Sequence, residues 1–395
     1  MFPEINFLKE LGEIGKIFLS LWWLYLPPVL FFISADLWVL YLKIKTISKI
    51  KWQLLEIKIP KDIQKTPKAM EQVFSGLHGI HVWMFTFADK YLKGKIQEWF
   101  SFEIVGINGD IYFFVYTPAQ FRNLVEAQIY AQYPAAEINE ASDDYTGRIP
   151  EDVPGRDYDL WGTELILIKP DPYPIRTYEY WEAIPEEQRL DPLASLTEVL
   201  SKLKQGEQIW IQFLIKPTGM KWVEEGKALV DELIGKRPKA KYSFWGRFAI
   251  VPEFLRNLIW APFMEPVWTE GKKEGEREAP PSLISFLSPG AKEVVEAVEK
   301  DIAKLGFDAA VRFLYLARKD IFSRVNVAAI MGCFKQFNTQ NLNGFMPNIS
   351  VSTSVRYPFF KKKREYLRKR RLLMRYKFRV PASKFFVLNI EELAT

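Results

Sequence analysis

Residues 98–118, EWFSFEIVGINGDIYFFVYTP, decide how the first part of the chain folds. Two runs rich in aromatic and β-branched residues are joined at Asn108-Gly109, a dipeptide that is the strongest short-range signal for a β-hairpin. The sequence therefore predicts two antiparallel strands with a tight turn between them.

The segments on either side of this hairpin complete a recognisable order. Residues 52–60 alternate like a strand, and a helix opens at Thr66-Pro67. After the hairpin, a helix begins at Pro118, and residues 135–141 read as a last strand. The order β-α-β-β-α-β over residues 43–141 predicts a first α+β domain of the ferredoxin-like split βαβ type.

The next block predicts a second domain. Residues 142–158 are polar and carry turn formers, as expected of a linker. Residues 159–360 alternate strand-like and helix-like runs, repeating the pairing of the first block without a residue-level repeat. Within them, residues 266–282 are charged and contain Pro and Gly, so we expect a mobile loop. The predicted fold class is α+β, with two linked domains.

A membrane helix is predicted before these domains. Residues 17–35, IFLSLWWLYLPPVLFFISA, carry no charge, and after Asp36 the apolar run continues to Leu42. The uncharged part alone would reach about 28 Å, close to the thickness of a hydrocarbon core. We therefore expect a transmembrane helix over residues 17–42. Its expected interface anchors are aromatic: Trp22, Trp23, Trp38 and Tyr41.

Two other interpretations of this segment are weaker. A cleaved signal peptide needs a basic start and a shorter apolar run, and a re-entrant hairpin at Pro27-Pro28 would leave each half too short to cross. The C-terminal flank is crowded with lysines, at positions 43, 45, 49 and 51. The positive-inside rule then predicts a short extracytoplasmic tail over residues 1–16 and a cytoplasmic bulk, at the inner membrane.

The net charge of +6 is unevenly distributed. Residues 361–379, KKKREYLRKRRLLMRYKFR, contain eleven basic residues and one acid, so the remainder of the chain sums to −4. This basic segment predicts contact with an anionic partner, and nucleic acid, anionic lipid and a protein surface all remain open. The expected contact residues are Lys361, Lys362, Lys363, Arg364, Arg368, Lys369, Arg370 and Arg371.

Several kinds of catalytic or metal site are disfavoured. The single cysteine, Cys333, cannot form an internal disulfide, and the two histidines, His78 and His81, lack a third ligand near in sequence. None of the five Gly-Lys pairs is followed by Ser or Thr, as a phosphate-binding loop requires. Glutamate pairs such as Glu224-Glu225 and Glu391-Glu392 read as solvated helix surface. We expect no catalytic residues, cofactor or metal in this chain.

The C-terminus predicts a strand followed by the start of a helix, over residues 380–395. Asn389 precedes Glu392 by three residues, the spacing of a capping box. The helix has few residues before the chain stops, so we expect that a longer architecture would continue there.

Taken whole, several stretches resemble a known family. WQLLEIKIP, TPKAMEQVFSGLHG, PAQFRNLVEAQIYAQYP, DPLASLTEVLSKLKQGEQIWIQ and LNIEELAT are similar to the membrane-anchored N-terminal half of type IV secretion and conjugation-type ATPases, a class that includes coupling proteins and HerA/FtsK-like motors. In that family a P-loop motor domain would follow LNIEELAT, and this sequence lacks it.

The resemblance implies a non-catalytic, membrane-anchored platform in a DNA or protein transfer machine, or the N-terminal half of such an ATPase. It also implies oligomerisation and a partner that is a P-loop ATPase or another secretion component, with DNA a further possible partner. The alternative is a membrane-tethered protein that binds nucleic acid without sequence specificity.

Overall fold

The predicted hairpin forms in a computed structural model that describes residues 20–60, 65–182, 192–236, 287–355, 358–381 and 384–395. Strands β2 (Phe100–Ile107) and β3 (Asp110–Pro118) pair antiparallel around Asn108-Gly109. Both turn residues have positive φ, 55° and 100°, which is the conformation that Asn and Gly tolerate best. The turn chemistry read from the sequence is confirmed.

The first half of the chain adds two strands and two helices to this hairpin. Its elements run β1 (Trp52–Lys58), α3 (Lys68–Leu77), β2, β3, α5 (Arg122–Gln132) and β4 (Glu137–Glu140). The strands lie in the order β4-β1-β3-β2, and every neighbouring pair is antiparallel.

The second half repeats this order with its own strands. It runs β5 (Tyr158–Leu167), α6 (Tyr178–Glu182), α7 (Pro192–Ser201), β6 (Glu207–Pro217), α8 (Lys221–Leu233), α11 (Pro289–Ile302), β7 (Gly306–Arg318), α12 (Arg324–Lys335) and β8 (Phe345–Pro347). The strands lie in the order β8-β5-β7-β6, again all antiparallel. Where the first half has a two-residue turn, the second has α8 and α11.

The two halves form one continuous sheet within the described residues. Strands β2 and β6 pair antiparallel from Phe100↔Ile215 to Ile107↔Gln208, and β9 (Phe386–Asn389) pairs with the N-terminal end of β7. The two halves thus meet through equivalent strands, which relates them by an approximate two-fold axis between β2 and β6. The predicted α+β class is confirmed, and the halves share a sheet.

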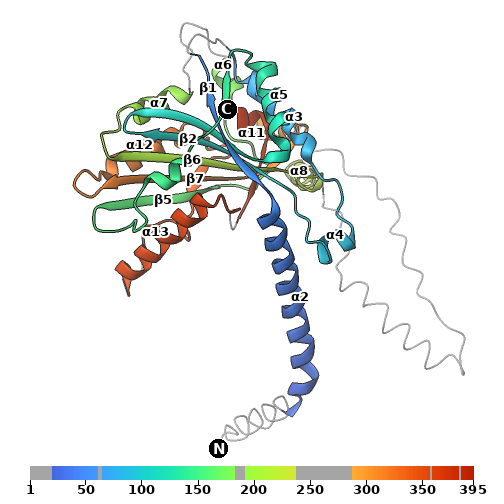
Figure 1. The fold of residues 1–395 in the computed structure, drawn as a ribbon. Helices are drawn as coiled ribbons and strands as arrows, with labels where there is room; N and C mark the ends of the chain where they lie inside the picture. Colours follow the sequence, from blue (N-terminus) through green and yellow to red (C-terminus); the bar gives the residue numbers. More distant parts are fainter. Residues whose placement is uncertain (1–19, 61–64, 183–191, 237–286, 356–357, 382–383) are drawn as a thin grey trace, which may run out of the picture.

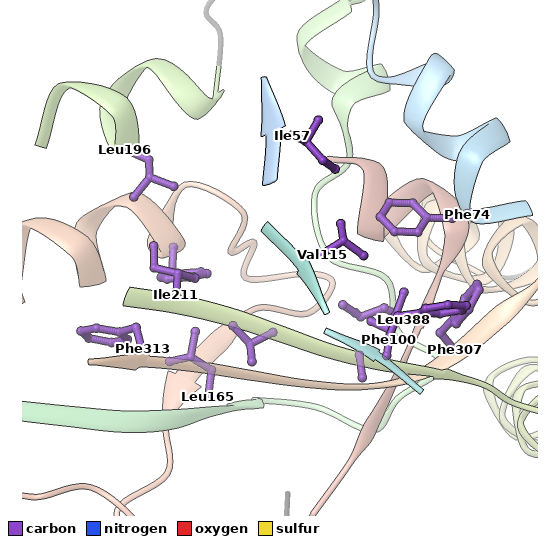
Figure 2. Packing of buried hydrophobic residues seen from close by; sticks show 14 of the residues in the cluster. Ile57, Phe74, Phe100, Val115, Leu165, Leu196, Ile211, Phe307, Phe313 and Leu388 are labelled. Carbon is purple, nitrogen blue, oxygen red and sulfur yellow. The ribbon is translucent and has the colours of Figure 1, made fainter. Parts of the chain in front are cut away.

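Helices cover one face of this sheet (Figure 1). Buried side chains from both halves form one cluster beneath them, and Figure 2 shows Ile57 and Val115 of the first half in the same layer as Leu165 and Phe313 of the second. Fully burying an aliphatic or aromatic side chain of this size stabilises the fold by about 1.5–3 kcal/mol. This common core holds the two halves together.

The opposite face is covered by α13 (Lys361–Lys377) and by the segment between the halves. Residues 142–158, expected to be a polar linker, are in part buried, because Tyr145, Ile149 and Val153 pack against the sheet. Central strands β6 and β7 are therefore buried on both faces, which explains their continuous apolar runs.

The helix expected over residues 17–42 is α2, described from Trp22 to Lys49, so it continues past the predicted end. The predicted C-terminal strand and helix start are confirmed as β9 and α14 (Ile390–Ala394), with the Asn389–Glu392 capping box formed. The tail over residues 1–16 and the loop over residues 266–282 lie outside the described residues.

Candidate functional sites: the N-terminal helix and the basic helix

Helix α2 leaves the body of the protein (Figure 1), and its apolar side chains are exposed over most of its length. Only 6% of its most apolar stretch is buried against the rest of the chain. Its 28 residues correspond to about 42 Å, more than a hydrocarbon core requires. Among the described residues, α2 is the one helix long and apolar enough to cross a membrane. The four predicted anchors are all exposed: Trp22, Trp23, Trp38 and Tyr41.

Helix α13 contains the predicted basic contact residues, and the structure divides them into two groups. The first group consists of exposed side chains, four in the first turn of the helix and two at its middle, and we call it the tip. This group is Lys361, Lys362, Lys363, Arg364, Arg370 and Arg371. A basic surface is thus present at the tip.

Arg368 and Lys369 instead hold the helix to the body of the protein. Arg368 donates hydrogen bonds to the backbone carbonyls of Ile349 and Ser352, at 3.2 and 3.0 Å. The Lys369 ammonium lies 2.6 Å from a carboxylate oxygen of Asp159 on β5. Arg368 and Lys369 thus have partners in the body, whereas the other six predicted contact residues are exposed.

Beneath the C-terminal end of α13, which we call the root, a row of polar side chains crosses four strands of the sheet. Its members are directly opposite one another: Glu103 of β2, Gln212 of β6, Arg312 of β7 and Glu164 of β5. The amide of Gln212 donates to Glu103 at 2.9 Å. Arg312 donates to Gln212 at 3.1 Å and to Glu164 at 3.0 Å. We call this row the polar ladder.

The root of α13 docks on the ladder through its backbone. Arg312 donates to the carbonyl of Arg375, and Gln212 donates to the carbonyl of Tyr376, at 3.1 and 3.3 Å. A guanidinium against the last carbonyls of a helix also complements the negative end of its dipole. The ladder therefore fixes where α13 leaves the sheet.

Arg379, just after the helix, closes this network. It is buried, bonds to Glu103 through Nε at 3.0 Å, and also bonds to Asp144. Burial lowers the pKa of the Arg379 guanidinium, but the nearby Glu103 and Asp144 outweigh it, so the pKa is raised overall. Burial raises the pKa of the Tyr145 and Tyr376 hydroxyls, whose oxygens lie 3.0 Å apart, so they stay neutral. Charge in this cluster is compensated internally, which indicates a structural role.

The polar ladder is not among the features predicted from the sequence, although the strands contain a signal for it. Each of four strongly apolar strands contains a charged or amide side chain near its middle, at positions 103, 164, 212 and 312. Such residues need partners when buried, so their recurrence in four strands indicates a buried polar row.

A second buried polar cluster lies where α14 packs against α3 and α11. Glu391 and Glu392 are buried there, so the interpretation of this pair as solvated surface was wrong, whereas Glu224 and Glu225 are exposed as expected. Lys304 bonds to Glu391 and Glu71. Burial raises the pKa of Asp301 and also that of Glu392, to about 8. The reason for the error is that both carboxylates have partners in the folded chain, Lys304 for Glu391 and the backbone N–H groups of Ile175 and Asn389 for Glu392.

Beside this cluster is a cleft of about 270 Å³. It is lined by side chains that include Arg176, Tyr180, Asp301 and Glu391. The cleft is small and mixed in charge, and no ligand chemistry follows from it.

The two histidines and the cysteine occupy packed positions. The rings of His78 and His81 lie 5.4 Å apart, and His78 contacts Phe307 edge to face. Cys333 is buried on α12. No group of three or more His, Cys, Asp or Glu side chains able to hold a metal is found among the described residues.

Fold and surface together define a class: an α+β body with one antiparallel sheet, preceded by one exposed apolar helix. A family model described as "Domain of unknown function (DUF8128)" matches residues 43–381. The chain belongs to this family. The match begins at Lys43 and so leaves out the apolar part of α2. No curated protein matches the chain significantly.

Proposed function

We propose that the protein is a non-catalytic platform, anchored by one span of α2 in the inner membrane with its body in the cytoplasm. The observation that carries this proposal is the exposure of α2, whose apolar stretch projects from the body and packs little on it. Water is an unfavourable solvent for such a surface, and lipid is a favourable one. The lysines at positions 43, 45 and 49 of the helix support the cytoplasmic orientation.

For the body, we infer that each half is a ferredoxin-like split βαβ unit. The strand orders β4-β1-β3-β2 and β8-β5-β7-β6, each with helices after its first and third strands, support this reading. Two such units joined edge to edge give a broad, rigid base on which other subunits could assemble.

The platform would serve a secretion or conjugation-like machine, alongside a P-loop ATPase, as an oligomer. The resemblance to the N-terminal half of such ATPases and the absence of a complete phosphate-binding loop at any Gly-Lys pair support this assignment. The tip of α13 would contact DNA through its phosphates, since clustered Lys and Arg side chains bind that backbone without reading sequence.

A second candidate for the tip is anionic lipid. The last turn of α2 packs through Ile47 beside Trp99, Leu214 and Ala310, on the face of the sheet that α13 also covers. In Figure 1 the two helices project to the same side of the body. A tip that approaches the membrane surface would meet lipid headgroups first.

Fractionation tests the anchor. Membranes from cells that make the full chain are washed with alkaline carbonate, and we expect the protein to stay in the pellet. Recovery in the soluble fraction would contradict the proposal. Fluorescence anisotropy with duplex DNA, and co-sedimentation with vesicles of anionic lipid, then separate the two candidates for the tip.

A further inference from the structure

An exposed apolar segment lies beside α2, outside the sheet. Residues 82–92 include the short helix α4 (Phe87–Tyr91) and connect the first helical layer to β2. Trp83 and Met84 are each 81% exposed, and Phe87 and Leu92 are exposed as well. Four large apolar side chains within ten residues are an unusual surface for a protein in water.

Three contacts tie the end of this segment to α2. The indole N–H of Trp38 donates to the carbonyl of Tyr91 at 3.2 Å, and the hydroxyl of Thr46 donates to the carbonyl of Lys93 at 3.1 Å. A Cβ at Gly94 would lie 2.6 Å from the backbone of Leu42, so only glycine permits this approach. Figure 1 shows α4 beside the part of α2 nearest the body. Residues 82–92 are therefore held beside the part of α2 that contains Trp38 and Leu42.

Local hydrogen bonds and ion pairs stabilise the conformation of the segment. Thr86 and Asp89 form a capping box at the start of α4, and Asp89 pairs with Lys93 and Lys95 at 3.4 and 3.0 Å. The rings of Phe87 and Tyr91 lie 4.5 Å apart. The polar groups are thus bonded within the segment, while the apolar side chains point outwards.

Basic residues outnumber acidic residues in and around the segment. Residues 82–95 contain three lysines and one aspartate, and α2 adds further lysines at 43, 45 and 49. Aromatic and apolar side chains rimmed by lysines are typical of a surface that sits in the headgroup region of anionic lipid.

We propose that residues 82–92 dock into the interfacial layer of the bilayer next to α2, as a second membrane contact of this protein. The inference rests on α2 being a membrane span, because Trp38 then lies at the interface and the segment attached to it lies at the same depth. The two contacts together would fix the tilt of the body above the membrane, which a single helix leaves free.

Spin-label depth measurements test the inference in the full chain. Cys333 is replaced by alanine, and single cysteines are introduced at Met84, at Leu30 in the middle of α2, and at Val325 on the exposed start of α12. The labelled proteins are reconstituted into vesicles of phosphatidylcholine and phosphatidylglycerol. Collision with oxygen, which concentrates in lipid, is compared with collision with a water-soluble nickel chelate.

We expect oxygen collisions to exceed nickel collisions at position 84 and the opposite at position 325, with position 30 the most lipid-accessible. In the background Trp83→Ser and Phe87→Ser, nickel access at position 84 should rise several-fold, while position 30 stays unchanged. Lipid access at 30 with aqueous access at 84 would overturn the inference and leave the span intact. Aqueous access at 30 would overturn the proposed function instead. Shielding of position 84 from both reagents would show a protein cover and also overturn the inference.

Discussion

Helices α2 and α13 both project from the sheet, but they differ in what they need around them. Helix α2 is apolar and exposed along most of its length, and it makes few contacts with the body. Helix α13 is charged and exposed at its tip, but its root is buried on the polar ladder through Leu372, Leu373 and Tyr376. The comparison teaches that charge alone does not identify a binding surface, because two of the eight predicted contact residues, Arg368 and Lys369, instead hold the helix to the body.

The largest expected effect concerns α2. Leu30→Arg combined with Phe31→Arg puts two charges near the middle of the predicted span, where each costs about 2.5–3.5 kcal/mol of insertion free energy. We expect the double variant to leave the carbonate-resistant membrane fraction. Leu30→Ala with Phe31→Ala is the control and should remain in it. Equal retention of both variants in the membrane fraction would contradict the proposal that α2, unlike α13, requires lipid around it.

The next effect concerns the root of α13. Arg379→Ala leaves Glu103 and Asp144 without their buried partner, and we expect a loss of about 3–5 kcal/mol in the free energy of unfolding. Denaturant unfolding of the full chain in detergent measures it. Lys363→Ala, at the tip, should stay within about 0.5 kcal/mol of the unmodified protein. A small effect at Arg379 would mean that its buried bonds to Glu103 and Asp144 do not stabilise the fold.

A smaller loss of stability is expected when the hydroxyl of Tyr376 is removed. Tyr376→Phe removes the hydrogen bond to Tyr145 while keeping the ring, and should cost about 1 kcal/mol of unfolding free energy. Tyr366→Phe is matched to it, because Tyr366 is exposed on the same helix and its hydroxyl accepts a hydrogen bond from Arg370 at 3.2 Å. That variant should be nearly neutral. The same unfolding measurement compares the two.

The smallest effect on stability, and the sharpest on binding, is expected at the tip. Replacing Lys361, Lys362, Lys363, Arg370 and Arg371 by Gln should leave stability unchanged and flatten the salt dependence of DNA binding, whose slope is about −0.9 per phosphate contacted. Anisotropy across a salt series measures that slope.

Arg368→Gln with Lys369→Gln is the counterpart of this tip variant. It should cost about 1 kcal/mol of stability and leave the slope nearly unchanged, since both side chains already have partners in the body. The reverse outcome for the two variants would contradict the division of these basic residues into an exposed group and a group held by the body.

Local chemistry predicted much of the fold. Asn108-Gly109 identified the hairpin, and Asn389 with Glu392 identified the capping box, because both signals act within a few residues. The alternation in the second block also indicated a repeat of the first. What local signals could not predict was that β2 and β6 would pair, since the edge of one unit looks the same whether it faces solvent or another edge.

The burial of certain polar residues also could not be predicted from the sequence. Tyr145, Glu392 and Arg379 all lie in segments that read as polar, yet each is buried with partners distant in sequence. Buried hydrogen bonds and ion pairs of this kind depend on tertiary contacts, so a linear pattern contains little information on them. For the same reason, the eight predicted contact residues of α13 could not be divided into exposed residues and residues held by the body before the fold was known.

Membrane sidedness tests the central claim most directly. Right-side-out and inverted vesicles from cells that make the full chain are treated with protease, and the body is detected by an antibody against residues after Trp52. The account predicts protection of the body in right-side-out vesicles and its digestion in inverted ones, with a protected fragment that contains α2. Digestion in right-side-out vesicles, or loss of the protein from both membrane preparations, would contradict a single span with a cytoplasmic body.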